Sequence, residues 1–458
     1  MIEQSKVPRV LQMEAQDSPL DKVIDSITRG MSRKAFRTRL RMLARISPGN
    51  AAIICDHILA EKTEQNIKAS TAESKVKTLL WLTRYLEQKP FEQMTKQDIL
   101  SYLNSIRKNV EDDPQQRWIG SYNGRLRVFI KFFKWLYNRD ETDYRKRASP
   151  PCIQGLKQLP RRDGSSYRPA DLWDSREHAI FLKYCPSARD RCYHAMANDM
   201  SARPHELLNL KIKDIVFKAT EDGVQYAEVL IRGGKTKSRT LPMIDSVPFV
   251  KEWIQQHPTG TNIESWLFIS VAHANFGQKL ERDSLLAKYQ YRYKAVYFPK
   301  LLGSETVPEA DKAMIRNMLT KPWNLYVFRH SALTEKSQFL TESTLRDHAG
   351  WTMSSKMPTV YLHYFGTESA KKLLEAKGII QRGESNLNIL KSKLCPNCNE
   401  PNKPDSRFCL KCRMVLSLSA FEDAKRKEEE TLRDLAEIRE FAALVRKSKF
   451  IDLLRQES

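Results

Sequence analysis

The sequence predicts a mainly helical protein with one small β-sheet, an α+β chain of several domains. Hydrophobic residues recur at helical spacing over most of its 458 residues, and one stretch, 224–243, alternates apolar and polar residues as strands do. A chain of this length exceeds one compact core, and its 41% hydrophobic residues can bury more than one. We therefore expect roughly two to four domains.

The charge balance predicts a polyanionic partner. The chain has 77 Lys and Arg against 55 Asp and Glu, a net charge of +22, and neutralising phosphates drives most of the affinity for nucleic acids. No apolar run approaches the roughly 18 residues of a membrane span, and the first twenty residues lack the apolar core of a secretory signal. We expect a cytoplasmic, nucleoid-associated protein without a membrane partner.

The N-terminal third predicts two helical regions. Residues 1–60 read as a basic helical extension, whose charges either touch phosphates or face solvent. Residues 61–145 read as a small helical domain, with Thr71 and Thr95 as expected N-caps and Asp98 completing a capping box. Its last helix carries Arg and Lys beside an apolar stripe, which suits a helix that packs inward and faces a phosphate backbone, although a generic bundle would look similar.

A basic, proline-rich linker is expected at 146–170, followed by a mixed region over 171–385 that contains the predicted hairpin. Beyond a cysteine-rich segment at 394–416, residues 419–458 predict one long charged helix. A single apolar stripe on this helix predicts a packing partner, either the same chain or another subunit.

Several side chains could hold and attack a phosphodiester. Arg203 directly precedes a predicted helix, and Glu206 one turn later could orient its guanidinium. Lys235 lies at the tip of the hairpin and could donate a proton, with Lys237 as an alternative. Arg329 opens another helix and is followed by His and Ser. Two arginines that converge on one phosphate stabilise the charge of its transition state.

A late tyrosine, Tyr361, follows a Gly-Trp pair and a segment rich in Ser, Met and Pro. A tyrosine hydroxyl can act as a covalent nucleophile toward phosphorus. Each of these residues alone is more often structural, but their order along the chain is specific.

Over roughly residues 60–380 the chain resembles the tyrosine recombinase (phage integrase) family. The motifs that carry the resemblance are "ARPHELLNL" around the first arginine, "FRHSALT" around the second, and "AGWT" followed by "TVYLHY". The resemblance implies that 61–145 is a DNA-clamping core-binding domain and 171–385 the catalytic domain. It also implies the catalytic residues Arg203, Lys235, Tyr326, Arg329, Trp351 and Tyr361.

Two positions depart from the family pattern. Tyr326 stands where the family usually has a histidine three residues before the second arginine, and Trp351 stands where a second histidine is common. Both side chains can still donate a hydrogen bond to a phosphate oxygen. The interval from Trp351 to Tyr361 is one residue longer than is usual, which leaves Tyr364 as an alternative nucleophile.

The resemblance implies a site-specific recombinase or integrase that forms a 3′-phosphotyrosyl intermediate without ATP or a catalytic metal. Its partner would be double-stranded DNA with specific recombination sites, bound by a homotetramer that is monomeric when free. A type IB topoisomerase shares this chemistry and is one alternative. A catalytically inactive DNA-binding protein on the same scaffold is another, suggested by the departures at Tyr326 and Trp351.

The cysteine-rich segment predicts a structural metal site. Its pattern is two CxxC pairs separated by ten residues, formed by Cys395, Cys398, Cys409 and Cys412. Four thiolates at this spacing can enclose a tetrahedral Zn²⁺, whereas a redox role would need a different structural context. Such a ribbon after the tyrosine resembles an archaeal or mobile-element variant of the family.

Overall fold

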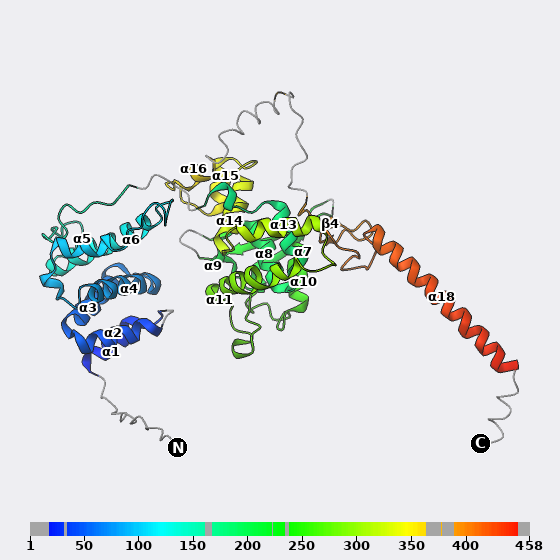
Figure 1. Ribbon diagram of the computed structural model, residues 1–458, viewed down its shortest axis with the longest axis horizontal. Helices are drawn as coiled ribbons and strands as arrows, with labels where there is room; N and C mark the ends of the chain where they lie inside the picture. The colour runs from blue at the N-terminus through cyan, green and yellow to red at the C-terminus, as the bar shows by residue number, and fades with distance from the viewer. Residues whose placement is uncertain are drawn as a thin grey trace, which may run out of the picture. The chain divides into compact units, whose positions relative to one another are not determined.

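The computed structural model describes residues 18–31, 34–160, 167–221, 223–233, 238–362, 377 and 389–447 (Figure 1). The chain divides into two compact units, 1–166 and 167–458. Each has its own hydrophobic core, so the expected mainly α architecture with small sheets is confirmed.

Unit 1 is a bundle of helices around a single core. Ile24 and Leu40, from the basic N-terminal stretch, are buried in the same cluster as Leu79, Leu126 and Phe129. The first helices therefore pack as part of the bundle, because their apolar faces turn inward and leave the arginines outside. Its helices are α1 (Pro19–Thr28), α2 (Lys34–Ile46), α3 (Pro48–Gln65), α4 (Ala69–Tyr85), the 3-10 turn η1 (Phe91–Gln93), α5 (Lys96–Asn104) and α6 (Trp118–Tyr137).

The two expected N-caps in this unit have different outcomes. Thr95 caps α5, and Asp98 returns the bond by accepting from the Thr95 backbone N–H at 2.7 Å, so the capping box is confirmed. The prediction that Thr71 caps α4 is wrong, since the helix begins earlier and Lys68 is its N-cap. Asn66 ends α3 in the left-handed conformation, which lets the chain enter α4 after only three residues.

Unit 2 is built on the long buried helix α8, which packs against α7, α10 and α14. Its elements up to residue 362 are η2 (Pro169–Asp171), α7 (Ser175–Tyr184), α8 (Ala188–Met200), α9 (Pro204–Leu207), η3 (Ile212–Asp214), β1 (Ile215–Ala219), β2 (Gln225–Ile231), β3 (Arg239–Met243), α10 (Val247–Gln256), η4 (His273–Asn275), α11 (Arg282–Ala287), the π-helix η5 (Lys288–Tyr297), α12 (Phe298–Leu301), α13 (Glu309–Thr320), α14 (Leu325–Lys336), α15 (Glu342–Ala349) and α16 (Met357–Leu362).

The predicted hairpin forms the β2–β3 part of an antiparallel sheet of order β1-β2-β3. Val229 pairs with Ile215 on one side and Leu241 on the other, and all three side chains are buried. Strand β1 was not predicted, because beyond Ile215 its residues are exposed and show no alternation. The sheet delivers Arg239, the first residue of β3, to the site described below.

The C-terminal part consists of β4 (Lys393–Leu394), β5 (Pro401–Asn402) and α18 (Leu418–Lys447). In the described part of α18, Leu432, Leu435, Ile438 and Phe441 remain exposed, so the predicted apolar stripe is not packed on the same chain there. Among the residues that the structure describes, no helix is long and apolar enough to cross a membrane.

Truncation of the core residue Leu126 to Ala should destabilise unit 1. Its side chain is 0% exposed, and a Leu→Ala change at such a site costs about 2–5 kcal/mol of unfolding free energy. Hydrogen exchange on the full chain should show faster exchange in α3–α6 and unchanged protection in α8. The control Leu59→Ala removes a side chain that is 48% exposed on α3 and should change little; equal losses would contradict the assignment of this core.

Candidate active site

Three arginines converge on the C-terminal end of α15. Arg239 Nε donates to the carbonyl of His348 (3.2 Å), Arg329 Nη2 to that of Ala349 (2.7 Å) and Arg203 Nη2 to that of Gly350 (3.2 Å). These are consecutive carbonyls at the negative end of a helix, where cations are stabilised. One helix end therefore fixes three guanidinium groups contributed by distant parts of the chain.

Glu206 is the carboxylate that organises two of these arginines. It accepts from Arg203 Nη1 at 2.9 Å and from Arg239 Nη2 at 2.9 Å, and the Arg203 backbone N–H donates to it at 2.8 Å. Burial by itself raises the pKa of Glu206, but the hydrogen bonds and charges of these neighbours lower it to about 2. The expectation that Glu206 orients Arg203 agrees with this geometry.

The cluster carries an excess of positive charge. Arg203, Arg239 and Arg329 face one ionised carboxylate, Glu206, which leaves a net charge of about +2 before any ligand is present. Arg329 is only 4% exposed. Burial, together with the charge of Arg203, lowers its pKa to about 10, so it stays protonated at neutral pH. Such a surplus, partly desolvated, is suited to an anion that accepts several hydrogen bonds.

Tyr361 lies against this cluster. Its side chain is 1% exposed, and its hydroxyl is 2.8 Å from His330 Nδ1. Its ring is nearly parallel to those of His330 and Trp351, with centroids 5.4 Å and 5.3 Å away. The electrostatic interaction with Tyr361 raises the pKa of Arg329, against the larger effect of burial. The structure thus brings Arg203, Arg329, Trp351 and Tyr361 together, as the sequence suggested.

Arg346, on α15, holds the loop between α15 and α16. Arg346 Nη1 donates to the carbonyls of Thr352 (2.9 Å), Met353 (3.1 Å) and Ser355 (2.9 Å), while its Nη2 bonds to Glu342 at 2.6 Å. These bonds fix the turn that leads from the arginine cluster into α16. Arg346 therefore holds the backbone that leads into α16, the helix that carries Tyr361.

Other sequence candidates have different outcomes. Tyr326 lies in the first turn of α14, the helix that carries Arg329. Its side chain is 39% exposed, so it lies on the accessible side of this helix. Lys235, Lys237 and Tyr364 lie outside the residues that the structure describes.

Sequence reasoning missed Arg239 and Arg346 and did not assign a role to His330. Arg239 could have been suspected because it ends the basic turn of the hairpin, close in sequence to Lys235. His330 adjoins Arg329 in the sequence, but nothing in the sequence indicates that it reaches the hydroxyl of Tyr361. Arg346 shows no sequence signal beyond its charge, since its partners are backbone carbonyls of a loop.

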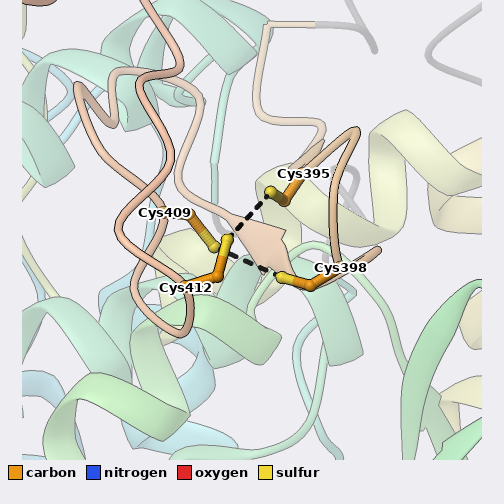
Figure 2. A group of neighbouring side chains, drawn as sticks. All are labelled: Cys395, Cys398, Cys409 and Cys412. Carbon is orange, nitrogen blue, oxygen red and sulfur yellow. Dashed lines mark hydrogen bonds between the residues drawn. The ribbon is translucent and has the colours of Figure 1, made fainter.

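A second site consists of the four predicted cysteines (Figure 2). Their sulfur atoms all lie within 4.8 Å of one another, with Cys395–Cys412 at 3.5 Å and Cys398–Cys409 at 3.6 Å. Four thiolates around a tetrahedral Zn²⁺ at about 2.3 Å would be separated by about 3.8 Å. The cluster could therefore hold a metal ion.

The two CxxC turns have the same backbone geometry. In each, the N–H that follows the second cysteine donates back to the carbonyl of the first, at 2.9 Å for Asn399 and 3.0 Å for Arg413. Both of these following residues have a positive φ, 55° and 64°. Two matched turns that present four thiols inward are typical of a structural metal ribbon.

The ribbon is attached to the sheet and to α10 by charged contacts. Glu400 bonds to Lys251 on α10 and to Gln225 on β2, the latter at 3.1 Å. Lys403 forms an ion pair with Glu252 at 2.6 Å. The cysteine segment therefore packs on the same unit as the arginine cluster.

Comparisons with known proteins found similar solved structures at low identity. The XerH site-specific recombinase bound to a palindromic difH substrate is 14% identical, with a TM-score of 0.47, covering 80% of this chain and 98% of that one. A lambda integrase dimer bound to a COC′ core site is 13% identical, with a TM-score of 0.44, covering 74% and 84%. No protein-family model and no curated protein matches the chain. A likeness at this level of identity concerns the fold alone.

Substitution of Gly350 by Ala should destabilise the arginine cluster. Gly350 ends α15 with φ +65°, and an added Cβ would lie 2.6 Å from Arg239 Nη1. The left-handed conformation costs an L-residue about 1–2 kcal/mol, and Arg239 would also have to move. Urea unfolding should detect a loss of at least this size. At Gly303, where an added Cβ has an ordinary 3.8 Å contact, the same change should be nearly neutral, and equal effects would contradict this account.

Proposed function

We propose that this chain is a site-specific DNA recombinase or integrase that cleaves and rejoins DNA strands through a phosphotyrosyl intermediate. The observation that carries the proposal is the placement of Tyr361 beside the buried, positively charged cluster of Arg203, Arg239 and Arg329. The surplus charge supports binding of a phosphodiester, and the tyrosine supplies the nucleophile. The net charge of +22 supports DNA as the macromolecule that carries the phosphate.

Arg203 and Arg329 would bind the nonbridging oxygens of the scissile phosphate, with Tyr326 and Trp351 as additional hydrogen-bond donors. Glu206 and the carbonyls that end α15 hold two of the guanidiniums in place before DNA arrives. A cluster that is preorganised in this way loses little free energy to rearrangement when charge develops on the phosphate. Arg239 shares the same carboxylate and would fix the position of Arg203.

In the reaction, the Tyr361 oxygen forms a bond to phosphorus and the bond from phosphorus to the 5′-oxygen breaks. Lys235 would give its proton to the departing 5′-oxygen. A 5′-hydroxyl of a partner strand then attacks the phosphotyrosyl bond and releases Tyr361. Bond energy is conserved over the two steps, so neither ATP nor a catalytic metal is required. Two DNA sites would be joined in a homotetramer of this chain, which is monomeric when free.

We also propose that the ribbon binds one Zn²⁺ through Cys395, Cys398, Cys409 and Cys412. Four cysteine ligands leave no open coordination position, which favours a structural role over a catalytic one. The ion would stabilise the segment whose Glu400 and Lys403 pack on α10 and the sheet.

Substitution of Tyr361 by Phe should abolish covalent attachment to DNA. Wild type, incubated with nicked duplexes that carry candidate recombination sites, should give an SDS-resistant protein–DNA adduct. The Phe variant lacks only the hydroxyl, so it should bind the same DNA and form no adduct. Tyr291→Phe, which removes the hydroxyl of an exposed tyrosine of the same unit, should form the adduct at the wild-type rate.

Each other outcome of this experiment would point to a different nucleophile or a different activity. An adduct that survives in Tyr361→Phe would point to Tyr364. Relaxation of supercoiled DNA without site preference would favour a type IB topoisomerase. Tight DNA binding with no adduct on any substrate would support the inactive scaffold.

Removal of the metal should release about one Zn²⁺ per chain and lower the thermal stability of unit 2. A colour-forming chelator added after thiol modification measures the release, and differential scanning calorimetry measures the stability, because metal binding adds to the folding free energy. Cys398→Ser should contain less than one equivalent. Cys152→Ser, which alters a cysteine of unit 1, should keep the full equivalent; equal zinc in both variants would contradict the assignment.

A further inference from the structure

The hydroxyl of Tyr361 is in hydrogen-bond contact with an imidazole that the reaction described above does not use. His330 Nδ1 lies 2.8 Å from the phenol oxygen, within the distance at which proton transfer occurs. His330 directly follows Arg329 on α14, so the buried arginine fixes the helix position from which the imidazole reaches α16. The ring of Tyr167 also contacts the imidazole, with the two ring centroids 4.8 Å apart, and the Tyr167 hydroxyl donates to Asn324 at 2.8 Å.

The environment keeps this imidazole neutral and able to accept a proton. Burial, and then the charge of Arg329, lowers the pKa of His330 to about 4. A neutral imidazole that accepts at Nδ1 carries its own hydrogen at Nε2. The arginines of the cluster and the indole N–H of Trp351 are hydrogen-bond donors only, so they could not take this proton.

We propose that His330 is the general base of strand cleavage, taking the phenol proton of Tyr361 as the tyrosine attacks phosphorus. This inference rests on the proposed function and adds a catalytic residue to it. The contact between His330 Nδ1 and the phenol oxygen carries the assignment.

The proton and the electrons balance with the groups already named. The Tyr361 O–H bond breaks as the oxygen–phosphorus bond forms, and the proton moves to His330 Nδ1. The phosphorus–5′-oxygen bond breaks, and its electron pair stays on the 5′-oxygen, which takes a proton from Lys235. When a phosphodiester anion binds at the arginines, it offsets part of the charge of Arg329 and so raises the pKa of His330 toward the range of an effective base. In the rejoining step the imidazolium returns its proton to the tyrosine oxygen.

The same contact has a competing explanation. Tyr361 is 1% exposed, so its hydrogen bond to His330 could hold the nucleophile away from DNA until α16 moves. Loss of the histidine would then speed cleavage, whereas loss of a base would slow it. The two explanations therefore predict changes of opposite sign.

The test is single-turnover cleavage of a nicked duplex by His330→Asn, with DNA binding measured separately by fluorescence anisotropy. Asn places an amide oxygen near the position of Nδ1, so it can accept the hydrogen bond but not the proton. Cleavage should slow on the order of 100-fold, the usual range for loss of a general base, with DNA affinity unchanged. His273→Asn, which replaces an exposed histidine of the same unit, should cleave at the wild-type rate.

A second variant keeps the proposal testable if Asn perturbs folding. His330→Ala should be slow, and added imidazole should restore its rate in proportion to the concentration of the neutral form. The wild-type rate should fall as the pH drops through the pKa of His330 in the DNA complex, because the protonated ring cannot accept. Among the residues that the structure describes, the ionisable groups that act on or contact the ring are Arg329, Tyr361 and Tyr167. Phenols and guanidiniums ordinarily titrate above pH 9.

Three results would overturn the inference. Cleavage by His330→Asn at the wild-type rate would reduce His330 to a hydrogen-bond acceptor. Faster cleavage by His330→Ala would establish the contact as a restraint on Tyr361. If wild type itself forms no adduct on any substrate, the proposed function fails and the role of His330 fails with it.

Discussion

The end of α15 is the constraint on which the site depends. Its last carbonyls are consecutive, and each accepts a hydrogen bond from a different arginine: Arg239 from the sheet, Arg329 from α14, and Arg203 from the start of α9. A helix C-terminus is the negative end of the helix dipole and leaves carbonyls without partners inside the helix. The guanidiniums satisfy these carbonyls, and in return the helix end fixes their positions. Gly350 permits this packing, because a side chain there would meet Arg239.

The arginine cluster has more positive charge than its own carboxylate neutralises. Glu206 neutralises one of three guanidiniums and orients two, which leaves a charge of about +2 that is not compensated within the cluster. Holding like charges together in a buried place opposes folding, and an incoming phosphate would relieve that repulsion. Burial, and then the charge of Arg329, lowers the pKa of His330 to about 4. Burial, and then the charges of Lys336, Arg329 and Arg239, lower the pKa of His348 to about 3, so both imidazoles are neutral at pH 7. The cluster thus excludes further cations while retaining neutral proton acceptors.

Tyr361 and the cysteine ribbon are held in unit 2 by different kinds of contact. Tyr361 reaches it through a short loop that Arg346 holds by three carbonyl contacts. The ribbon is fixed to α10 and the sheet by Glu400 and Lys403, and its matched CxxC turns would be held together by a bound ion. The first attachment consists of hydrogen bonds to backbone carbonyls of the loop that precedes α16. The second combines charged contacts with four cysteine sulfur atoms that lie close together and could hold a metal ion.

The sequence by itself determined the mainly helical class, the β2–β3 hairpin and the capping box of α5, since each depends on local spacing of apolar and capping residues. It also singled out Arg203, Arg329, Tyr361 and the four cysteines, because their order and spacing are specific. Only the tertiary structure decided that Arg239, Arg346 and His330 belong to the site. Their partners are backbone carbonyls, a carboxylate and a hydroxyl that lie far away in the sequence or show no side-chain pattern. Local periodicity also could not show that the basic N-terminal helices share one core with α4–α6, because that depends on which apolar faces meet in space.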